Sequence, residues 1–407
     1  MPERYIGRTI EPVIRKAAGE FPAVALTGPR QSGKTTLLKR LFGGSHRYVS
    51  LEPPDVRLSA VEDPRGFIEM YPPPVIYDEI QYAPGLLPYI KEKIDSKRGR
   101  HGQYIITGSQ NLLLAGAVAE SLAGRVAALR LLPLAWREKQ GRPQRRFPWE
   151  GKRLQAGIKA IPAERLWEGF LRGGYPELCA DPKRGAALWH SSYIQTYLER
   201  DVRALRQVGD LAQFQNFLRA LAARAAGLLD LSGLSRDLGV AVNTAKAWLS
   251  ILEATYQVVV LRPYFANVGK RLVKTPKVYF TDVGTLCHLA GLKDPAHAAA
   301  GPMGGAIFET AVVMEIFKTI VHRGADPRIY FWRTSAGVEV DTVIEDDRRL
   351  IPIEIKLSST PRPAMASSIK TFKEDFGDRA APGYLIHPGN IRLPLGSGVT
   401  ALPFTEL

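Results

Sequence analysis

Residues 28–36 have the spacing of small, polar and basic residues that phosphate-binding loops use. The segment reads Gly-Pro-Arg-Gln-Ser-Gly-Lys-Thr-Thr and matches G-x-x-x-x-G-K-[ST] between an apolar run and a helical one. Such glycines let backbone N–H groups surround a β-phosphate, and the following helix adds the positive end of its dipole. We expect Lys34 to reach the β and γ oxygens, and Thr35 to offer a hydroxyl to Mg²⁺. The expected nucleotide contacts are Gly28, Pro29, Arg30, Gln31, Ser32, Gly33, Lys34, Thr35 and Thr36.

A pair of acids follows another apolar run, in the segment Pro-Val-Ile-Tyr-Asp-Glu at 74–79. A carboxylate at the end of a strand can hold Mg²⁺ through water, and a second one can polarise the attacking water as a general base. The pattern therefore assigns the metal to Asp78 and the base to Glu79. Together with Lys34, these acids predict triphosphate hydrolysis.

Two further segments supply polar candidates for the same chemistry. The strand-like run 102–107 ends close to Ser109 and Gln110, either of which can contact a γ-phosphate or position water; a plain strand with an N-cap is the alternative. Arg125 can neutralise transition-state charge, in its own chain or in a neighbouring subunit. Arg130 and Arg137 compete for that role, and a surface ion pair is the other interpretation of Arg125.

The C-terminal part contains a second group of acids on a predicted hairpin, 337–345 and 350–357. If the turn centres between Asp347 and Arg348, Asp341 lies opposite Glu354, and Glu339 lies opposite Lys356, all on one face. Opposed carboxylates repel unless a cation lies between them, so this pattern predicts a second Mg²⁺ site with Lys356 beside it. Glu309 is a third candidate ligand. The spacing is that of PD-(D/E)xK nucleases, and a solvated polar hairpin face is the alternative.

The elements around these residues indicate an α/β protein with three domains. Short apolar strands alternate with helices from about residue 20 to 137, which predicts a parallel sheet with helices on both faces. The basic stretch 139–153 loses apolar periodicity and is interpreted as a linker or exposed loop. Residues 163–254 read as helical, and a Gly, Ala and Pro-rich loop at 291–305 precedes a long helix at 306–322. The predicted domains are 1–150, 151–300 and 301–407.

Residues 230–252 have the pattern of a helix-turn-helix, with a turn at Gly239 and a second helix capped by Asn243. The following segment 262–277 carries five basic residues and no acid, as expected for the wing of a winged helix: Arg262, Lys270, Arg271, Lys274 and Lys277. One interpretation places Asn243, Thr244 and Lys246 in a major groove. The other is a packing module, and in both Trp248 and Leu249 are core residues.

The amino-acid composition indicates which class of partner the protein binds and which cellular compartment it occupies. The 407 residues carry a formal charge of +15 and the sequence pI is about 9.7, so a polyanion, and DNA in particular, is the expected partner. Two cysteines, Cys179 and Cys287, exclude a disulfide framework and suit a reducing cytosol. No apolar run reaches the ~18 residues of a membrane span. We therefore expect a cytoplasmic protein without membrane segments.

Several motifs together resemble a prokaryotic AAA-type ATPase family whose members carry a C-terminal DUF4143 domain. The resemblance rests on 28–36, Ile-Tyr-Asp-Glu-Ile-Gln at 76–81, Thr-Gly-Ser-Gln at 107–110 and Ser-Leu-Ala-Gly-Arg at 121–125, with weaker matches at 173–177, 197–202, 274–284 and 337–341. It implies ATP and Mg²⁺ as cofactors, and an AAA-like core that assembles as a homo-oligomer, with a hexamer as one candidate size. It also implies a winged-helix middle and a nuclease-fold end.

Three functions remain open at this stage. The first is an ATPase that couples its nucleotide cycle to DNA binding or remodelling by the C-terminal half. The second is an ATP-gated transcriptional or toxin-control switch without motor activity. The third is an ATP-regulated, metal-dependent nuclease. The sequence names no protein partner.

Overall fold

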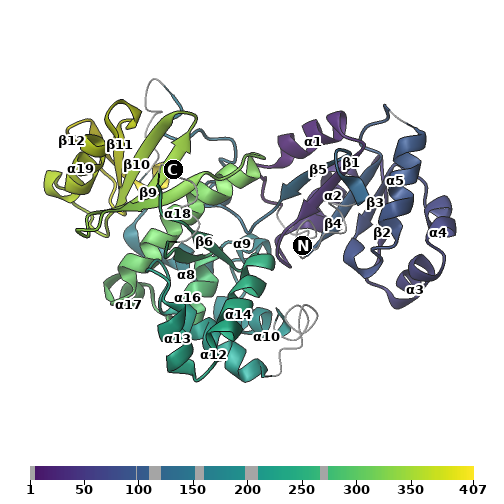
Figure 1. The fold of residues 1–407 in the computed structure, drawn as a ribbon, viewed down its shortest axis with the longest axis horizontal. Helices are drawn as coiled ribbons and strands as arrows, with labels where there is room; N and C mark the ends of the chain where they lie inside the picture. The colour runs from purple at the N-terminus through teal and green to yellow at the C-terminus, as the bar shows by residue number, and fades with distance from the viewer. Residues whose placement is uncertain (1–4, 98, 110–120, 152–159, 198–209, 266–273) are drawn as a thin grey trace.

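The computed structural model describes residues 5–97, 99–109, 121–151, 160–197, 210–265 and 274–407. An N-terminal sheet with its helices lies at one end of the molecule, a C-terminal sheet lies at the other, and a helical region lies between them (Figure 1). This arrangement confirms the α/β fold class. The boundaries 150/151 and 300/301 stay predictions.

The N-terminal sheet has five parallel strands in the order β2-β3-β4-β1-β5. Its strands are β1 (Ala23–Thr27), β2 (Arg47–Ser50), β3 (Val75–Asp78), β4 (Tyr104–Gly108) and β5 (Val126–Arg130). Its helical elements are α1 (Glu11–Glu20), α2 (Lys34–Phe42), α3 (Pro54–Glu62), α4 (Pro64–Met70), η1 (Ile80–Tyr82), α5 (Leu86–Ser96) and α7 (Trp136–Lys139). All carboxyl ends of these strands meet at one edge, which therefore holds the segments that follow β1, β3 and β4.

Side-chain alternation along the strands explains why both faces of this sheet are covered. Val24 and Ile105 pack with α1 and α2 in one apolar cluster. Tyr77 and Ile106 point to the opposite face and pack with α4 and α5 in another. Because a parallel sheet is buried on both sides, its strands read as continuous apolar runs in the sequence.

The middle region is helical, as predicted. It contains α8 (Ala163–Arg172), α9 (Pro176–Ala180), α10 (Ala186–Tyr197), α12 (Leu211–Ala222), α13 (Leu231–Leu238), α14 (Val242–Ala254), α16 (Val283–Leu289) and α17 (Pro295–Ala300). Strands β6 (Val258–Leu261) and β7 (Lys277–Phe280) form an antiparallel pair. The expected loop at 291–305 was wrong, because Asp294 accepts a hydrogen bond from the backbone N–H of His297 and caps α17.

The helix-turn-helix pattern is present, with two corrections. Gly239 ends α13 with a φ of +65°, the left-handed conformation that glycine adopts without strain. The prediction that Asn243 caps the next helix was wrong, because α14 begins at Val242 and Ala241 is its N-cap, two residues before Asn243. Lys277 is buried in ion pairs and does not belong to a phosphate-contacting wing. Lys270 and Arg271 lie outside the described residues.

The C-terminal region combines one long helix with a six-stranded mixed sheet in the order β12-β13-β11-β10-β9-β8. The strands are β8 (Ile329–Arg333), β9 (Glu339–Asp346), β10 (Arg349–Ile355), β11 (Gly383–His387), β12 (Leu393–Gly396) and β13 (Val399–Pro403). The helical elements are α18 (Gly304–His322), η3 (Pro363–Ala366), α19 (Ser367–Phe376), η4 (Gly377–Arg379) and η5 (Phe404–Glu406). Arg349 pairs with Asp346 and Ile353 with Thr342, which confirms the expected hairpin register.

Helix α18 joins the middle region to the C-terminal sheet. It is apolar and nearly all of its residues are buried, as expected for a helix at the centre of a packed unit. Figure 1 shows it between the helices of the middle region and the C-terminal sheet. One continuous apolar cluster contains residues from Leu132 to Leu407, including those of α18. The middle and C-terminal regions therefore share a core.

The basic stretch at 139–153 is not simply exposed. Phe147 is buried, and the guanidinium groups of Arg137 and Arg323 lie 4.3 and 4.9 Å from the centre of its ring. Arg323 also pairs with Glu150. These contacts fasten 145–150 to the end of α18, so the expected exposed linker was wrong for these residues. Among the described residues, none of the helices is both long and apolar enough to cross a membrane.

Candidate functional site

The phosphate-binding loop leaves β1 through a close approach of two backbone segments. Gly28 has a φ of +151°, and a Cβ atom at this position would lie 2.0 Å from the carbonyl oxygen of Leu131. Gly33 has a φ of +92° and is the N-cap of α2. Only glycine fits this first position, since any side chain there would collide with β5's continuation. The loop thus places the N-terminus of α2 at the carboxyl edge of the sheet.

Lys34 spans this loop from inside. Its Nζ atom donates to the carbonyl oxygens of Gly28 at 3.0 Å and Pro29 at 3.1 Å. The residue is only 5% exposed. These contacts hold the ammonium group in the hollow of the loop, where Lys34 lines the adjoining cavity.

Asp78 lies at the end of β3 and accepts hydrogen bonds from three hydroxyl groups. Thr35 Oγ1 and Tyr48 OH donate to its Oδ2 at 2.9 and 2.6 Å, and Thr107 donates to Oδ1. Burial and the bond to Asp78 raise the pKa of Tyr48 well above its usual value. A carboxylate beside a threonine hydroxyl is a donor set of hard oxygens, which is the set that Mg²⁺ prefers.

Glu79 occupies a left-handed backbone conformation with a φ of +61°, which is uncommon for a residue with a Cβ atom. Its backbone N–H donates to Thr107 Oγ1 at 3.1 Å. Its carboxylate accepts from Gln81 and from the backbone N–H of Ser109 at 3.2 Å. Ser109 is therefore next to Glu79, and its contact with the γ-phosphate stays a prediction. Gln110 lies outside the described residues.

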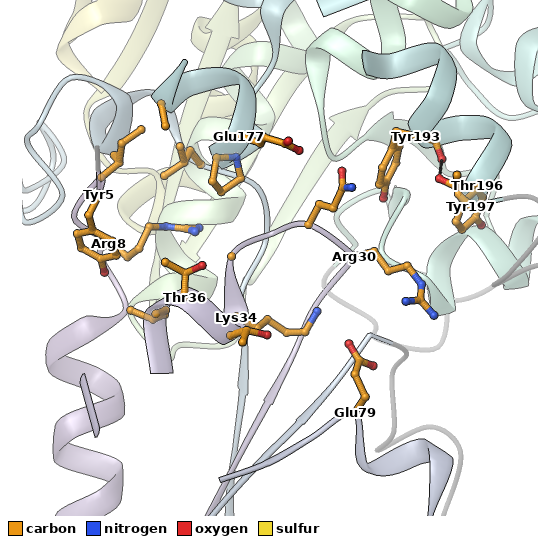
Figure 2. A pocket seen from close by; sticks show the side chains of 18 of the residues that line it. Tyr5, Arg8, Arg30, Lys34, Thr36, Glu79, Glu177, Tyr193, Thr196 and Tyr197 are labelled. Atoms are coloured by element: carbon orange, nitrogen blue, oxygen red, sulfur yellow. Dashed lines mark hydrogen bonds between the residues drawn. The ribbon is translucent and has the colours of Figure 1, made fainter. Parts of the chain in front are cut away.

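These side chains border a cavity of about 580 Å³, which we call the loop cavity. Lys34, Glu79 and Arg30 lie on one side of it, and Glu177, Tyr193 and Tyr197 lie on the other (Figure 2). The latter three come from α9 and α10 of the helical region. Sequence reasoning did not include them, because nothing in their spacing shows that these helices cover the loop.

Arg8 is the clearest residue that sequence reasoning missed. It lines the loop cavity, and its guanidinium donates to the backbone oxygens of Ser32 at 2.9 Å and Leu132 at 2.6 Å. The same group pairs with Glu138 at 3.3 Å. Arg8 thereby ties the loop to the segment after β5. In the sequence it is one of 55 basic residues, so its type carried no signal.

Glu138 extends this network to α18. Its Oε1 lies 3.2 Å from Nδ1 of His322, while the backbone N–H of Leu132 donates to Nε2 of that ring. Nε2 therefore carries no proton, and burial lowers the pKa of His322. Burial alone would raise the pKa of Glu138, but Arg8 and His322 hold it well below its usual range. The loop, α7 and α18 are thus joined through buried charges.

Arg125 does not reach the loop cavity of its own chain. It precedes β5, whose first residue Val126 pairs with Ala23 at the start of β1, so it lies at the opposite edge of the sheet. Its guanidinium binds the carboxylate of Asp95 through two hydrogen bonds of 2.7 and 3.0 Å. A role in its own site is wrong on this geometry, and a role in a neighbouring subunit stays a prediction. Arg137 is buried against Glu315 at 3.0 Å.

The C-terminal acids lie together, but lysines supply their counter-charge. Lys277 Nζ lies 2.9 Å from Glu309 and 2.6 Å from Glu339. Lys356 pairs with Glu354 and lies 4.0 Å from Asp341. Within the described residues, no group of three or more His, Cys, Asp or Glu could hold a metal ion. The structure therefore does not support the second Mg²⁺ site expected at Glu309, Asp341 and Glu354 with Lys356, because ammonium groups take the place of the cation.

Charge in this cluster depends on pH near neutrality. Burial raises the pKa of Glu309 and of Glu354 to about 7. Burial lowers the pKa of Lys277, but the surrounding carboxylates outweigh it and raise that pKa above its usual value. A carboxyl whose folded pKa is raised stabilises the fold at pH below its unfolded value, and this contribution is lost as the pH rises through about 7.

We expect Lys277→Met to lower the free energy of unfolding by about 3–5 kcal/mol at pH 8, because it leaves the buried carboxylate of Glu309 without its ammonium partner, whereas Glu339 keeps Arg333. The loss should be smaller at pH 5, where Glu309 is protonated. Urea denaturation at both pH values measures the difference. The control is Lys373→Met, whose ammonium donates to the carbonyl oxygen of the exposed Ser397 at 2.7 Å. Equal losses at the two pH values would contradict this account.

Comparison with known proteins identifies the family to which the chain belongs. Residues 20–139 match the model of an AAA domain, 163–296 match a domain of unknown function, DUF8612, and 304–407 match a domain of unknown function, DUF4143. Uncharacterized proteins of Mycobacterium tuberculosis and Mycobacterium bovis are each 32% identical to the chain over 396 residues, 97% of this chain and 82% of theirs.

Two solved structures are also similar to the chain. A Walker-type ATPase of Pyrococcus abyssi is 15% identical with a TM-score of 0.45, over 71% of this chain and 97% of that one. A signal transduction ATPase with numerous domains from Pyrococcus horikoshii is 13% identical with a TM-score of 0.26, over 79% and 48%. The sequence matches are sufficient to show that the chain belongs to the AAA-type P-loop ATPase family with a C-terminal DUF4143 domain.

Proposed function

We propose that the chain binds ATP in the loop cavity and hydrolyses it there. The observation that carries this proposal is that Lys34, Thr35, Asp78 and Glu79 meet at one carboxyl edge of a parallel sheet, around a glycine loop and a cavity. Phosphates bind at such an edge because backbone N–H groups and a helix N-terminus point toward it.

Each residue then has one chemical task. Lys34 exchanges its bonds to the loop carbonyls for the β and γ oxygens, and the other loop residues of 28–36, except Pro29, donate backbone N–H groups to the phosphates. Thr35 and Asp78 would hold Mg²⁺, which supplies charge neutralisation when bound. Glu79 accepts a proton from the attacking water, and Ser109 and Gln81 orient its carboxylate.

The far wall of the cavity suggests how nucleotide could affect the rest of the molecule. Glu177 accepts a hydrogen bond from Trp189 at 2.8 Å and pairs with Arg184, so α9 and α10 hold each other. A nucleotide seated on the loop would contact this wall. We therefore propose that the ATP cycle alters the placement of the C-terminal half.

Double-stranded DNA is the partner that we propose for that half. Asn243 and Lys246 are exposed near the start of α14, and the net charge of +15 attracts phosphates. The alternative, a switch that binds one DNA sequence without moving, uses the same surface; ATP-driven unwinding or branch migration would exclude it. A homo-oligomer, with a hexamer as one candidate, belongs to the proposal, because Arg125 can act only on another copy's site.

We expect duplex or branched DNA to raise the ATPase rate several-fold, and the stimulation to weaken as salt rises from 50 to 200 mM. Each phosphate contact releases counterions, so the logarithm of the binding constant falls linearly with the logarithm of the salt concentration. Measuring turnover with duplex, branched and single-stranded DNA at two salt concentrations checks this. The double variant Asn243→Asp and Lys246→Glu, which adds one negative charge and reverses one positive charge, should abolish the stimulation and keep the basal rate. If none of the three DNA substrates changes the ATPase rate, the proposal that the C-terminal half acts on DNA is refuted.

A further inference from the structure

The turn that follows α14 contacts the loop cavity through three consecutive residues. Thr255, Tyr256 and Gln257 join α14 to β6, and the side chain of each one makes a hydrogen bond to a residue at that cavity or just before its loop. Tyr256 has a φ of +59° and its ring is buried. A residue with a Cβ atom rarely adopts this conformation, so surrounding contacts must hold the turn in place.

Tyr256 binds the residue from which the phosphate-binding loop starts. Its hydroxyl lies 2.8 Å from Oγ1 of Thr27, the last residue of β1, and both groups are buried. Thr27 Oγ1 also donates to the carbonyl oxygen of Leu129 at 3.3 Å. Either hydroxyl of the Tyr256–Thr27 pair can donate, and the two bonds form a chain from the end of α14 to β5. Burial raises the pKa of Tyr256, which keeps its hydroxyl protonated.

The two neighbours of Tyr256 bind tyrosines that line the cavity itself. Thr255 Oγ1 lies 2.7 Å from the hydroxyl of Tyr197, and Gln257 Nε2 donates to the hydroxyl of Tyr193 at 3.0 Å. Tyr193 and Tyr197 lie on the wall opposite Lys34 and Glu79 (Figure 2). The same turn is thus fixed both to the floor of the site and to its far wall.

The geometry leads to a proposal that rests on ATP binding as proposed above. We propose that Tyr256 is a positioning residue for the phosphate-binding loop, and that the turn 255–257 transmits nucleotide occupancy to α14. A ligand that shifts Tyr193 or Tyr197, or that reshapes the loop after Thr27, must stretch bonds of this turn or move it. Helix α14 moves with the turn as a rigid element.

The far end of α14 is where this movement has an effect. The helix has 13 residues, so it is about 20 Å long, and its N-terminal turn carries the exposed Asn243 and Lys246. Coupling of this kind is reciprocal, so whatever binds at that end must change ATP affinity by the same factor. The turn thereby links the proposed ATP site to the proposed DNA surface.

The first test is a double-mutant cycle on the pair of hydroxyls. Tyr256→Phe keeps the ring and removes one buried hydrogen bond, and we expect it to weaken ATP binding about fivefold, the effect of a typical hydrogen bond. Thr27→Val, which also removes the bond to Leu129, should weaken ATP binding at least as much, and the double variant should be no weaker than Thr27→Val, since the bond between the two hydroxyls is already lost there. Thr27→Ser, which keeps the hydroxyl and removes only the methyl group, should bind ATP as the parent does.

The second test follows α14 directly, by hydrogen–deuterium exchange of residues 242–254 with and without a non-hydrolysable ATP analogue. The parent should show a nucleotide-dependent change in exchange, and Tyr256→Phe should lose it. Tyr264→Phe is the matched control: this tyrosine is equally buried and accepts from Arg379 at 2.8 Å in the C-terminal region. It should keep the parent's response, which separates coupling from general loosening of the fold.

The outcomes of the two tests distinguish a failure of this inference from a failure of the proposed ATP binding. If the parent binds ATP, and Tyr256→Phe has the same ATP affinity and the same exchange response as the parent, the inference is overturned and the ATP site is left intact. Additive losses in the cycle would also overturn it. A parent that binds no ATP would remove the proposed function, and the inference with it. Both tests can still be interpreted if the protein does not bind DNA, because they measure ATP affinity and hydrogen exchange.

Discussion

The Glu79→Gln variant should bind ATP as tightly as the parent and hydrolyse it about 10²–10⁴ times more slowly. A general base contributes a factor of this size to the rate, whereas the amide keeps the shape of the side chain and cannot take a proton from water. The bond from the backbone N–H of Ser109 can remain, because the amide oxygen accepts it. The two quantities to measure are the ATP dissociation constant and single-turnover hydrolysis.

Glu92→Gln is the control for this experiment. Glu92 belongs to the same domain, pairs with Arg65 at 3.1 Å on the surface and lies on α5, away from the loop cavity. It should leave the turnover number unchanged. Normal turnover by Glu79→Gln would show that another group takes the proton, and would remove Glu79 from the mechanism.

The Lys34→Ala variant should lose ATP affinity by a factor of about 100 or more. The ammonium is buried and points into the loop, so its interaction with phosphate oxygens is a charge-assisted bond that is screened weakly by water. A charge-assisted hydrogen bond typically contributes about 1.5–3 kcal/mol, and the loss of a full positive charge beside a triphosphate adds to this.

Two measurements make the Lys34→Ala result interpretable. Lys16→Ala removes an exposed lysine whose ammonium lies 3.9 Å from Glu20 on α1, and it should bind ATP normally. The circular dichroism spectrum and melting temperature show whether the loop variant is folded, since Lys34 also bonds to the Gly28 and Pro29 carbonyls. A folded Lys34→Ala protein with the parent's affinity would refute the ATP site.

Some parts of the site follow from local sequence. Residues 28–36 and the acids Asp78 and Glu79 each follow an apolar strand directly, and parallel strands bring their carboxyl ends to one edge. The contact of Thr35 with Asp78 and that of Ser109 with Glu79 then need no long-range information beyond the strand order. The register of the hairpin 339–355 was predictable for the same reason, because a tight turn fixes pairing.

Other parts depended on which segments pack together. Arg125 had a plausible spacing, but the register of β5 with β1 places it at the wrong edge of the sheet. Lys277 appeared to belong to a basic wing, but the pairing of β7 and the position of α18 bury it against Glu309 and Glu339. The sequence gives the charge of a residue, but tertiary packing determines which residue forms an ion pair with it.

The sequence by itself therefore determined the family, the α/β sheet and the floor of the proposed ATP site, because those features are encoded within a few residues of each strand. Only the tertiary structure placed Arg8 under the loop, α9 and α10 over it, and Tyr256 against Thr27. The last two residues are 229 positions apart. Contacts at such separation arise from the burial of whole apolar faces, and no local pattern records which faces will meet.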